Sequence, residues 1–286
     1  MSYSKDNITI YNKDGIETLK EIEDGTVDLI LTDPPYVISK TSGMDALHKQ
    51  IKANETNKVK FVKTEEDWEK YKTTLDKPAE EIAAGKGKGW SKENYLKYGH
   101  ILGKKYATQT DYGNWDNDFT MEQLEEFIKQ YHKKLRKGGT LIIWFDLWKI
   151  TPLKELLEKY KFSKIRFVEW IKTNPQPINQ YTSYLSNCRE MALLAVKGSK
   201  PTFNSKYDKG VYEFPMASGK NKFHPTQKNI NLFEALIEKH SNEGDTVVDT
   251  FLGSGTTAIA CKNKKRKFIG CEINKEYFDK FVSILN

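Results

Sequence analysis

The chain has 286 residues, of which 30% are charged and 38% hydrophobic, and its mean hydropathy is −0.69. Its apolar runs fall far short of the roughly 20 residues that a membrane-spanning helix needs, so the composition excludes a membrane protein. Residues 1–7 are polar and resemble no signal peptide, and the three cysteines show no CxxC spacing. We therefore expect a reducing, cytoplasmic location without disulfides or a metal site.

The net charge of +7 is concentrated in two segments. Residues 37–110 contain 15 Lys and 10 acidic residues, and residues 171–228 contain 9 basic and 3 acidic residues. Basic segments on a neutral-to-acidic body favour a polyanionic partner such as nucleic acid, although Lys-rich surfaces also serve solubility alone. Charge by itself leaves both interpretations open.

Hydrophobic periodicity predicts alternating strands and helices along most of the chain. The expected strands are residues 8–11, 27–32, 140–145, 165–171, 191–196, 246–249 and 267–271. The expected helices are residues 121–135, 153–160, 229–240, 254–261 and 275–285, with Thr120 as N-cap and Gly138-Gly139 as the stop of the first. The alternation predicts an α/β fold with a doubly wound, mostly parallel, Rossmann-like sheet.

Residues 37–110 do not follow this alternation. A connection of this length is unusual in a compact domain, so we expect an insertion. It contains lysines but no arginine, which suits contacts to phosphates better than bidentate reading of guanine. A solvated flap is the alternative interpretation.

A glycine-containing turn follows one of the last predicted strands. It reads Asp249-Thr250-Phe251-Leu252-Gly253-Ser254-Gly255-Thr256-Thr257, and Glu272 ends the next strand. Glycines let the backbone approach a ligand closely, and an acid at the end of the following strand typically binds ribose hydroxyls. The pattern predicts a nucleotide-type cofactor, for which NAD and S-adenosylmethionine are both candidates; a purely structural turn is the alternative.

A second motif, Thr32-Asp33-Pro34-Pro35-Tyr36, ends an early strand, where the two prolines force the chain out of the sheet. Together with the glycine turn and His224-Pro225-Thr226-Gln227-Lys228, it resembles the S-adenosylmethionine-dependent DNA amino-methyltransferases, which modify N6 of adenine or N4 of cytosine. The order of the motifs resembles the β-type, circularly permuted arrangement of that family. Asn229 stands where the family commonly has proline.

The resemblance covers residues 8–42 and 112–286 and implies a division of the chain. Residues 1–36 and 111–174 are expected to form the catalytic half of the methyltransferase domain, and residues 37–110 the Lys-rich insertion. A target-recognition region is expected at residues 175–223 and a cofactor-binding half at residues 224–286.

The chemistry of the second motif agrees with the resemblance. The exocyclic amine of adenine is a poor nucleophile because its lone pair is delocalised into the ring. Asp33 and the carbonyl of Pro34 can accept its two hydrogens, Pro35 fixes the turn, and Tyr36 offers a stacking face to a base flipped out of the duplex. No proline precedes a cysteine, which argues against a cytosine-C5 mechanism.

The resemblance also implies contacts to the cofactor and the DNA. The residues expected at the cofactor are Asp14, Asp249, Phe251, Gly253, Ser254, Gly255, Thr256, Thr257, Glu272, Thr226, Gln227 and Lys228. The polar and basic residues expected at the DNA are Lys172, Asn174, Gln176, Arg189, Lys206, Lys209, Lys220 and Lys222.

The leading hypothesis is a site-specific adenine-N6 methyltransferase of double-stranded DNA, in a restriction–modification system, a phage or a solitary gene. Asp rather than Ser at the first position of the tetrapeptide favours adenine. Cytosine-N4 methylation, a non-catalytic DNA-binding regulator, and RNA or protein methylation are the alternatives. A second copy of the chain and a cognate restriction endonuclease are further partners compatible with the family.

Overall fold

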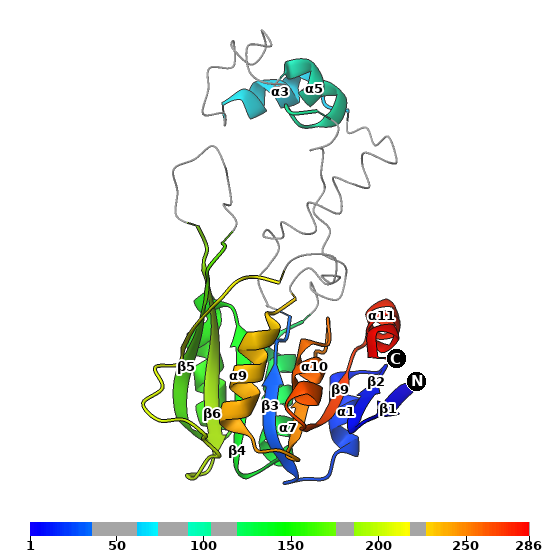
Figure 1. Ribbon diagram of the computed structural model, residues 1–286. Coiled ribbons are helices and arrows are strands. Elements are labelled where there is room, and N and C mark those ends of the chain that lie inside the picture. The colour runs from blue at the N-terminus through cyan, green and yellow to red at the C-terminus, as the bar shows by residue number, and fades with distance from the viewer. Residues whose placement is uncertain (36–61, 74–90, 104–118, 176–185, 218–226, 286) are drawn as a thin grey trace. The chain divides into compact units, whose positions relative to one another are not determined.

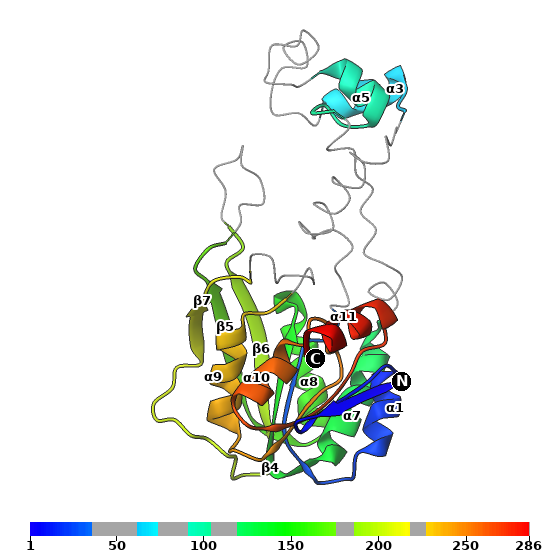
Figure 2. The same cartoon turned by 45° about the vertical axis from the view of Figure 1, so that its right-hand side comes forward.

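The computed structural model describes residues 1–35, 62–73, 91–103, 119–175, 186–217 and 227–285. Residues 1–38 and 118–286 form one compact unit, and residues 39–117 form a second. Figures 1 and 2 show the larger unit as a twisted sheet with helices on both faces.

The sheet of the larger unit has the strand order β1-β2-β9-β8-β3-β4-β6-β5-β7. Its strands are β1 Ser2–Lys5, β2 Ile8–Tyr11, β3 Val27–Thr32, β4 Leu135–Phe145, β5 Phe162–Lys172, β6 Arg189–Lys197, β7 Val211–Phe214, β8 Thr246–Asp249 and β9 Lys267–Cys271. From β2 to β4 all neighbours are parallel; β1 and β6 run antiparallel to their neighbours. The prediction of a mostly parallel α/β sheet is confirmed.

Helices cover each face of the sheet and enclose two hydrophobic cores. One core is covered by α1 Gly15–Glu21, α7 Met121–Lys134 and α8 Ile150–Lys159, which follows the short 3₁₀ helix η2 Leu147–Lys149. The other is covered by α9 Ile230–His240, α10 Thr256–Asn263 and α11 Lys275–Leu285. No helix in the described residues is long and apolar enough to cross a membrane.

Helix α7 begins where the sequence predicts, but the predicted stop signal does not end it. Thr120 caps the helix in a capping box, as its residue type predicts. The helix ends at Lys134, and β4 begins at Leu135, so the prediction that Gly138-Gly139 stops the helix was wrong. These glycines lie inside β4, where Gly138 has φ +87 and a Cβ would lie 2.3 Å from the carbonyl of Lys200. Pairing of Leu135 with Val27 of β3 ends the helix before the chain reaches the glycines.

The second unit contains two described helices, α3 Glu65–Lys72 and α5 Lys92–Tyr98. They pack through Trp68, Tyr95 and Ile101, which are all buried, and Tyr71 stacks on Tyr95 with the ring centres 4.3 Å apart. The segment that departs from the alternation therefore has a small hydrophobic cluster of its own.

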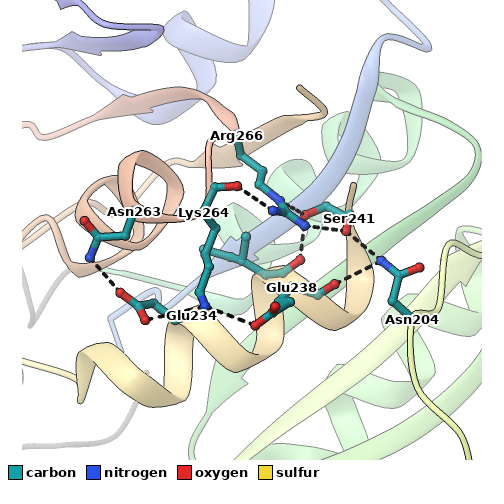
Figure 3. Close-up of polar contacts among 8 residues, drawn as sticks. Asn204, Glu234, Glu238, Ser241, Asn263, Lys264 and Arg266 are labelled. Carbon is teal, nitrogen blue, oxygen red and sulfur yellow. Dashed lines mark hydrogen bonds and ion pairs between the residues drawn. The ribbon is translucent and has the colours of Figure 1, made fainter. Parts of the chain in front are cut away.

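A buried polar cluster lies where β9 begins, at the amino ends of β8 and β9. Arg266 donates hydrogen bonds to the Ser241 hydroxyl (3.0 Å) and the Ser241 carbonyl (2.7 Å), as Figure 3 shows. Asn204 donates to the same carbonyl (2.9 Å). The cluster therefore fixes the segment between β6 and β7 to the end of α9.

Candidate active site

The two motifs meet at one edge of the sheet because β3 and β8 are parallel neighbours. Asp249 is the last residue of β8, and Asp33 directly follows the last residue of β3. The Thr32 hydroxyl donates to the Asp249 carboxylate (2.8 Å), so the ends of the two strands are joined directly. Segments 217 residues apart are thereby brought to one place.

The Asp249 carboxylate is buried and accepts several hydrogen bonds. Besides Thr32, the Thr257 hydroxyl (2.5 Å) and the Phe251 N–H (3.0 Å) donate to it. Burial raises the pKa of Asp249 to about 6, against the effect of these donors, and the nearby Asp33 carboxylate adds to the increase. A buried carboxyl group with a raised pKa in a cavity is typical of a functional site.

Hydrogen bonds to the end of β9 fix the glycine turn. The Leu252 N–H donates to the carbonyl of Cys271 (3.0 Å), and the Gly253 N–H donates to the Glu272 carboxylate (2.8 Å). Gly253 and Gly255 have positive φ of 51° and 75°, and Gly255 is the N-cap of α10 without a side-chain cap. The turn thus presents a helix N-terminus to the cavity, an arrangement that suits polar or anionic ligand groups.

Glu272 and Asp14 both have roles within the protein. Burial raises the pKa of Glu272, while the N–H groups of Asn274 and Gly253 that donate to its carboxylate act in the opposite direction. Asp14 caps α1 by accepting from the N–H groups of Ile16 (2.8 Å) and Glu17 (3.1 Å). Its contact with a cofactor stays a prediction.

A cavity of about 50 Å³ lies between the two motifs. Its lining includes a carboxylate from each motif, the glycine turn and one buried lysine: Asp33, Lys228, Phe233, Asp249, Phe251, Leu252, Gly253, Ser254, Thr256 and Thr257. Phe251 is fixed on the side of α7 by its contact with Phe127, at 4.7 Å between ring centres. Most of the cofactor residues predicted from the C-terminal motif are therefore brought together with Asp33.

Asp33 belongs to a cluster of four charged side chains of alternating sign. Lys228 lies 2.7 Å from an oxygen of Asp33 and 2.8 Å from an oxygen of Glu190, whose other oxygen lies 2.7 Å from Lys172. Although burial alone would raise the pKa of Glu190, the ammonium groups of Lys228 and Lys172 lower it to about 2. This carboxylate is therefore ionised in the folded protein.

Glu190 is the member of this cluster that sequence reasoning missed. The available signal was weak: it is one of only three acidic residues in the basic segment 171–228, and it directly precedes a predicted buried strand. Lys172 was predicted to contact DNA; its side chain is 15% exposed and pairs with Glu190. Lys228 was predicted at the cofactor; it pairs with Asp33, and its contact with a cofactor stays a prediction.

The other residues predicted at the DNA lie in separate places. Asn174 accepts a hydrogen bond from the N–H of Met216 (2.7 Å), and Arg189 pairs with Glu169 (2.8 Å) and is largely exposed. Exposed Lys206 and Lys209 follow Asn204, which is bonded to the end of α9, so the structure does not bring them together with Asp33. Five predicted site residues lie outside the described residues: Tyr36, Gln176, Lys220, Lys222 and Thr226.

The fold and this site together define an α/β protein that binds a nucleotide-type cofactor beside a carboxylate at the edge of its sheet. Comparison with known proteins agrees: the profile of the DNA methylase family (N6_N4_Mtase) matches residues 27–283. The chain belongs to this family of N6/N4 DNA methylases.

Individual relatives match over much or nearly all of the chain. The Type II methyltransferase M2.LlaDCHI of Lactococcus lactis subsp. cremoris is 26% identical over 96% of this chain and 88% of its own length. The Type II methyltransferase M2.DpnII of Streptococcus pneumoniae is 32% identical over 60% of this chain and 70% of its own length.

Solved structures show the same architecture. The M1.HpyAVI–SAM complex has a TM-score of 0.60 and 26% identity, covering 97% of this chain and 98% of that chain. The cytosine-N4-specific PvuII DNA methyltransferase has a TM-score of 0.63 and covers 96% of this chain and 85% of that chain. At 16% identity, this second likeness concerns the fold alone.

Proposed function

We propose that this protein transfers a methyl group from S-adenosylmethionine to the exocyclic N6 of adenine in double-stranded DNA. One observation carries the proposal: the carboxylate of Asp33 and the glycine turn at Gly253 line the same cavity. The amine acceptor and the cofactor turn are thus close enough to act on one reacting pair.

The residues present fit S-adenosylmethionine, which is bound in the related M1.HpyAVI structure. Gly253 and Ser254 would face its polar parts at the N-terminus of α10, and Phe251 would contact its flat base. Glu272 uses one lone pair on each oxygen to hold the turn and retains others for ribose hydroxyls. The cofactor supplies an electrophilic methyl group.

The protein's part in the reaction is to bind and orient the amine. Asp33 would accept a hydrogen bond from one amine N–H and the Pro34 carbonyl from the other, which directs the nitrogen lone pair toward the methyl group. Asp33 would then take up the proton that the nitrogen loses on methylation. Lys228 holds the Asp33 carboxylate in place through its 2.7 Å contact. Tyr36 is proposed as the stacking face for the flipped base.

The preference for adenine rests on Asp as the first residue of the catalytic tetrapeptide. The partner is double-stranded DNA, and the division into a catalytic half, a recognition region and a cofactor half is part of the proposal. The buried free thiols of Cys261 and Cys271 support a reducing, cytoplasmic location. A second copy of the chain and a restriction endonuclease stay predictions.

The test is to methylate mixed-sequence DNA and identify the modified nucleoside after digestion. We expect N6-methyladenine from the native protein and a turnover about 10²–10⁴-fold lower from Asp33→Asn, the contribution of a positioned proton acceptor. Cofactor and DNA affinity should be largely retained. Asp245→Asn is a matched control, because this carboxylate caps the turn before β8, where it accepts from the N–H of Asn242 (2.7 Å).

Each other outcome has a defined meaning. N4-methylcytosine would move the assignment to cytosine-N4. Sequence-specific DNA binding without methylation of any DNA would favour a non-catalytic regulator. Activity of Asp33→Asn equal to that of the native protein would remove Asp33 from the mechanism.

A further inference from the structure

The charged cluster Asp33–Lys228–Glu190–Lys172 joins four separate elements at the active edge of the sheet. Asp33 follows β3, Lys228 precedes α9, Glu190 lies at the start of β6 and Lys172 ends β5. Because β6 is antiparallel to β4 and to β5, its first residues lie at the same edge as the ends of those strands. The cluster is therefore a product of sheet topology, and its three contacts lie between 2.7 and 2.8 Å.

The environment makes these contacts strong. Lys228 is 7% exposed, and the other three side chains are 15–22% exposed, so solvent screens them far less than surface pairs. Each ammonium group also lies over a buried indole ring: Lys228 is 5.8 Å from the centre of Trp144, and Lys172 is 5.5 Å from that of Trp170. Both lysines are thus held in place from two sides.

The sharing of Lys228 has an electrostatic consequence for Asp33. If Lys228 paired with Asp33 alone, its positive charge would stabilise the negative charge of that carboxylate and make it a weaker hydrogen-bond acceptor. Glu190 competes for the same ammonium group and offsets part of its effect, while Lys172 in turn offsets part of the effect of Glu190. Along the cluster, Lys228 and Lys172 therefore lower the proton affinity of Asp33, and Glu190 raises it.

We propose that Glu190 and Lys172 are positioning residues that set the strength of Asp33 as a hydrogen-bond acceptor, acting through Lys228. This inference rests on the proposed function, because Asp33 must contact the amine. The charged groups of the described residues around Asp33 include Lys228 before α9, Glu190 from β6 and Asp249 from β8.

The test compares Glu190→Gln with Lys172→Gln in the full chain, using the single-turnover rate of methyl transfer as a function of pH. Removing the negative charge of Glu190 should lower the proton affinity of Asp33, so the acid limb moves by about one pH unit to lower pH. The plateau rate should fall about tenfold, less than the roughly 10²–10⁴-fold expected without Asp33. Lys172→Gln should move the acid limb to higher pH.

Two controls separate charge from structure. Lys172→Arg keeps the charge and should restore the native profile. Glu169→Gln removes a carboxylate from a different ion pair between β5 and β6, in which Glu169 lies 2.8 Å from Arg189, so the profile should not move. The carboxyl-carbon NMR signal that disappears in Asp33→Asn reports the same titration without turnover.

Opposite displacements in Glu190→Gln and Lys172→Gln support the proposal. Displacements in the same direction, or native profiles in both folded variants, would overturn it and leave the methyltransferase assignment intact. If Glu190→Gln fails to fold, Lys172→Gln and the NMR titration decide alone. Absence of methylation by the native protein would instead mean that the proposed function fails.

Discussion

At the residue scale, the buried carboxyl group of Asp249 links the site to the stability of the fold. Its pKa of about 6 lies above the ordinary value of 3.8. Between about pH 4 and pH 6, the Asp249 carboxyl group is therefore protonated in the folded protein and ionised in the unfolded chain. The stabilisation from this proton is fully present below about pH 4 and is lost as the pH rises through about 6. Ionised Asp249 therefore destabilises the fold at neutral pH.

Asp249→Asn should reveal this effect because the amide does not titrate and its NH₂ group can donate to the Thr257 hydroxyl. Between about pH 4 and pH 7, the difference in free energy of unfolding between the variant and the native protein should change by up to about 3 kcal/mol in favour of the variant. Urea unfolding at several pH values measures this difference, and a difference that does not change with pH would contradict the prediction.

Thr257→Val removes a hydrogen-bond donor to the Asp249 carboxylate. In this variant the pH midpoint of the change in stability should move to higher pH.

The site residues illustrate what a sequence can and cannot predict. Asp33 and Asp249 lie at one edge of the sheet, as expected for residues at the ends of parallel strands, and they line one cavity. The roles of Asp33, Asp249 and Glu272 toward substrate and cofactor come from the family resemblance and stay predictions. Glu190 was missed because its place in the charged cluster depends on the side chains of Lys172 and Lys228, which reach it from other elements. Such contacts follow from strand order and direction, which local periodicity does not contain.

At the scale of elements, the shape of the glycine turn depends on α11. Phe281, from the middle of that helix, lies against Gly255, where an added Cβ would be 2.1 Å from the ring. The turn before α10 is therefore shaped by a helix that contributes no residue to the lining of the cavity among those described. Glycine is required here both by the positive φ and by this close approach.

Gly255→Ala should destabilise the protein by two separable effects. The left-handed backbone costs about 1–2 kcal/mol, and overpacking against Phe281 adds about 1–3 kcal/mol. In a Phe281→Ala background only the backbone effect should remain, although that variant alone should cost about 3–5 kcal/mol. Urea unfolding of the four proteins in a double-mutant cycle gives the coupling energy. Strict additivity would mean that the helix moves away at no cost.

Buried strands and long amphipathic helices were predicted closely, whereas the exposed edge strands and one short helix were not. The strands at residues 8–11, 27–32, 246–249 and 267–271 and the helix at residues 275–285 have the predicted bounds. The strands β1 and β7 and the helix α1 were not predicted. Each has seven residues or fewer, and β1 and β7 lie at the edges of the sheet, so neither shows the continuous apolar run of a buried strand.

At the scale of the whole molecule, the excess of lysine in residues 37–110 predicts a clamp on DNA phosphates. Deleting residues 44–106 with a short linker should weaken DNA binding and flatten its dependence on salt. The slope of log K against log salt should fall by about 0.9 for each phosphate that the shortened chain no longer neutralises. DNA titrations at several salt concentrations measure this slope. Cofactor affinity is the control, because the described lining of the cavity belongs to the other unit.

An unchanged slope would contradict this prediction. The small cluster around Trp68 and Tyr95 would then serve another partner, such as a second copy of the chain. A slope that falls together with cofactor affinity would indicate that the deletion has disturbed the larger unit instead.

The pairing of early strands with late ones also determines when this protein can begin to work. β2 pairs with β9 and β3 with β8, and the bond from Thr32 to Asp249 spans 217 residues. At roughly 5–20 residues per second of synthesis, β8 is made about 10–40 seconds after β3. During that interval Asp33 exists without its cavity and a central strand presents an unpaired edge. We therefore expect the site to be incomplete, and the exposed strand edge to favour aggregation, until β8 and β9 have emerged from the ribosome.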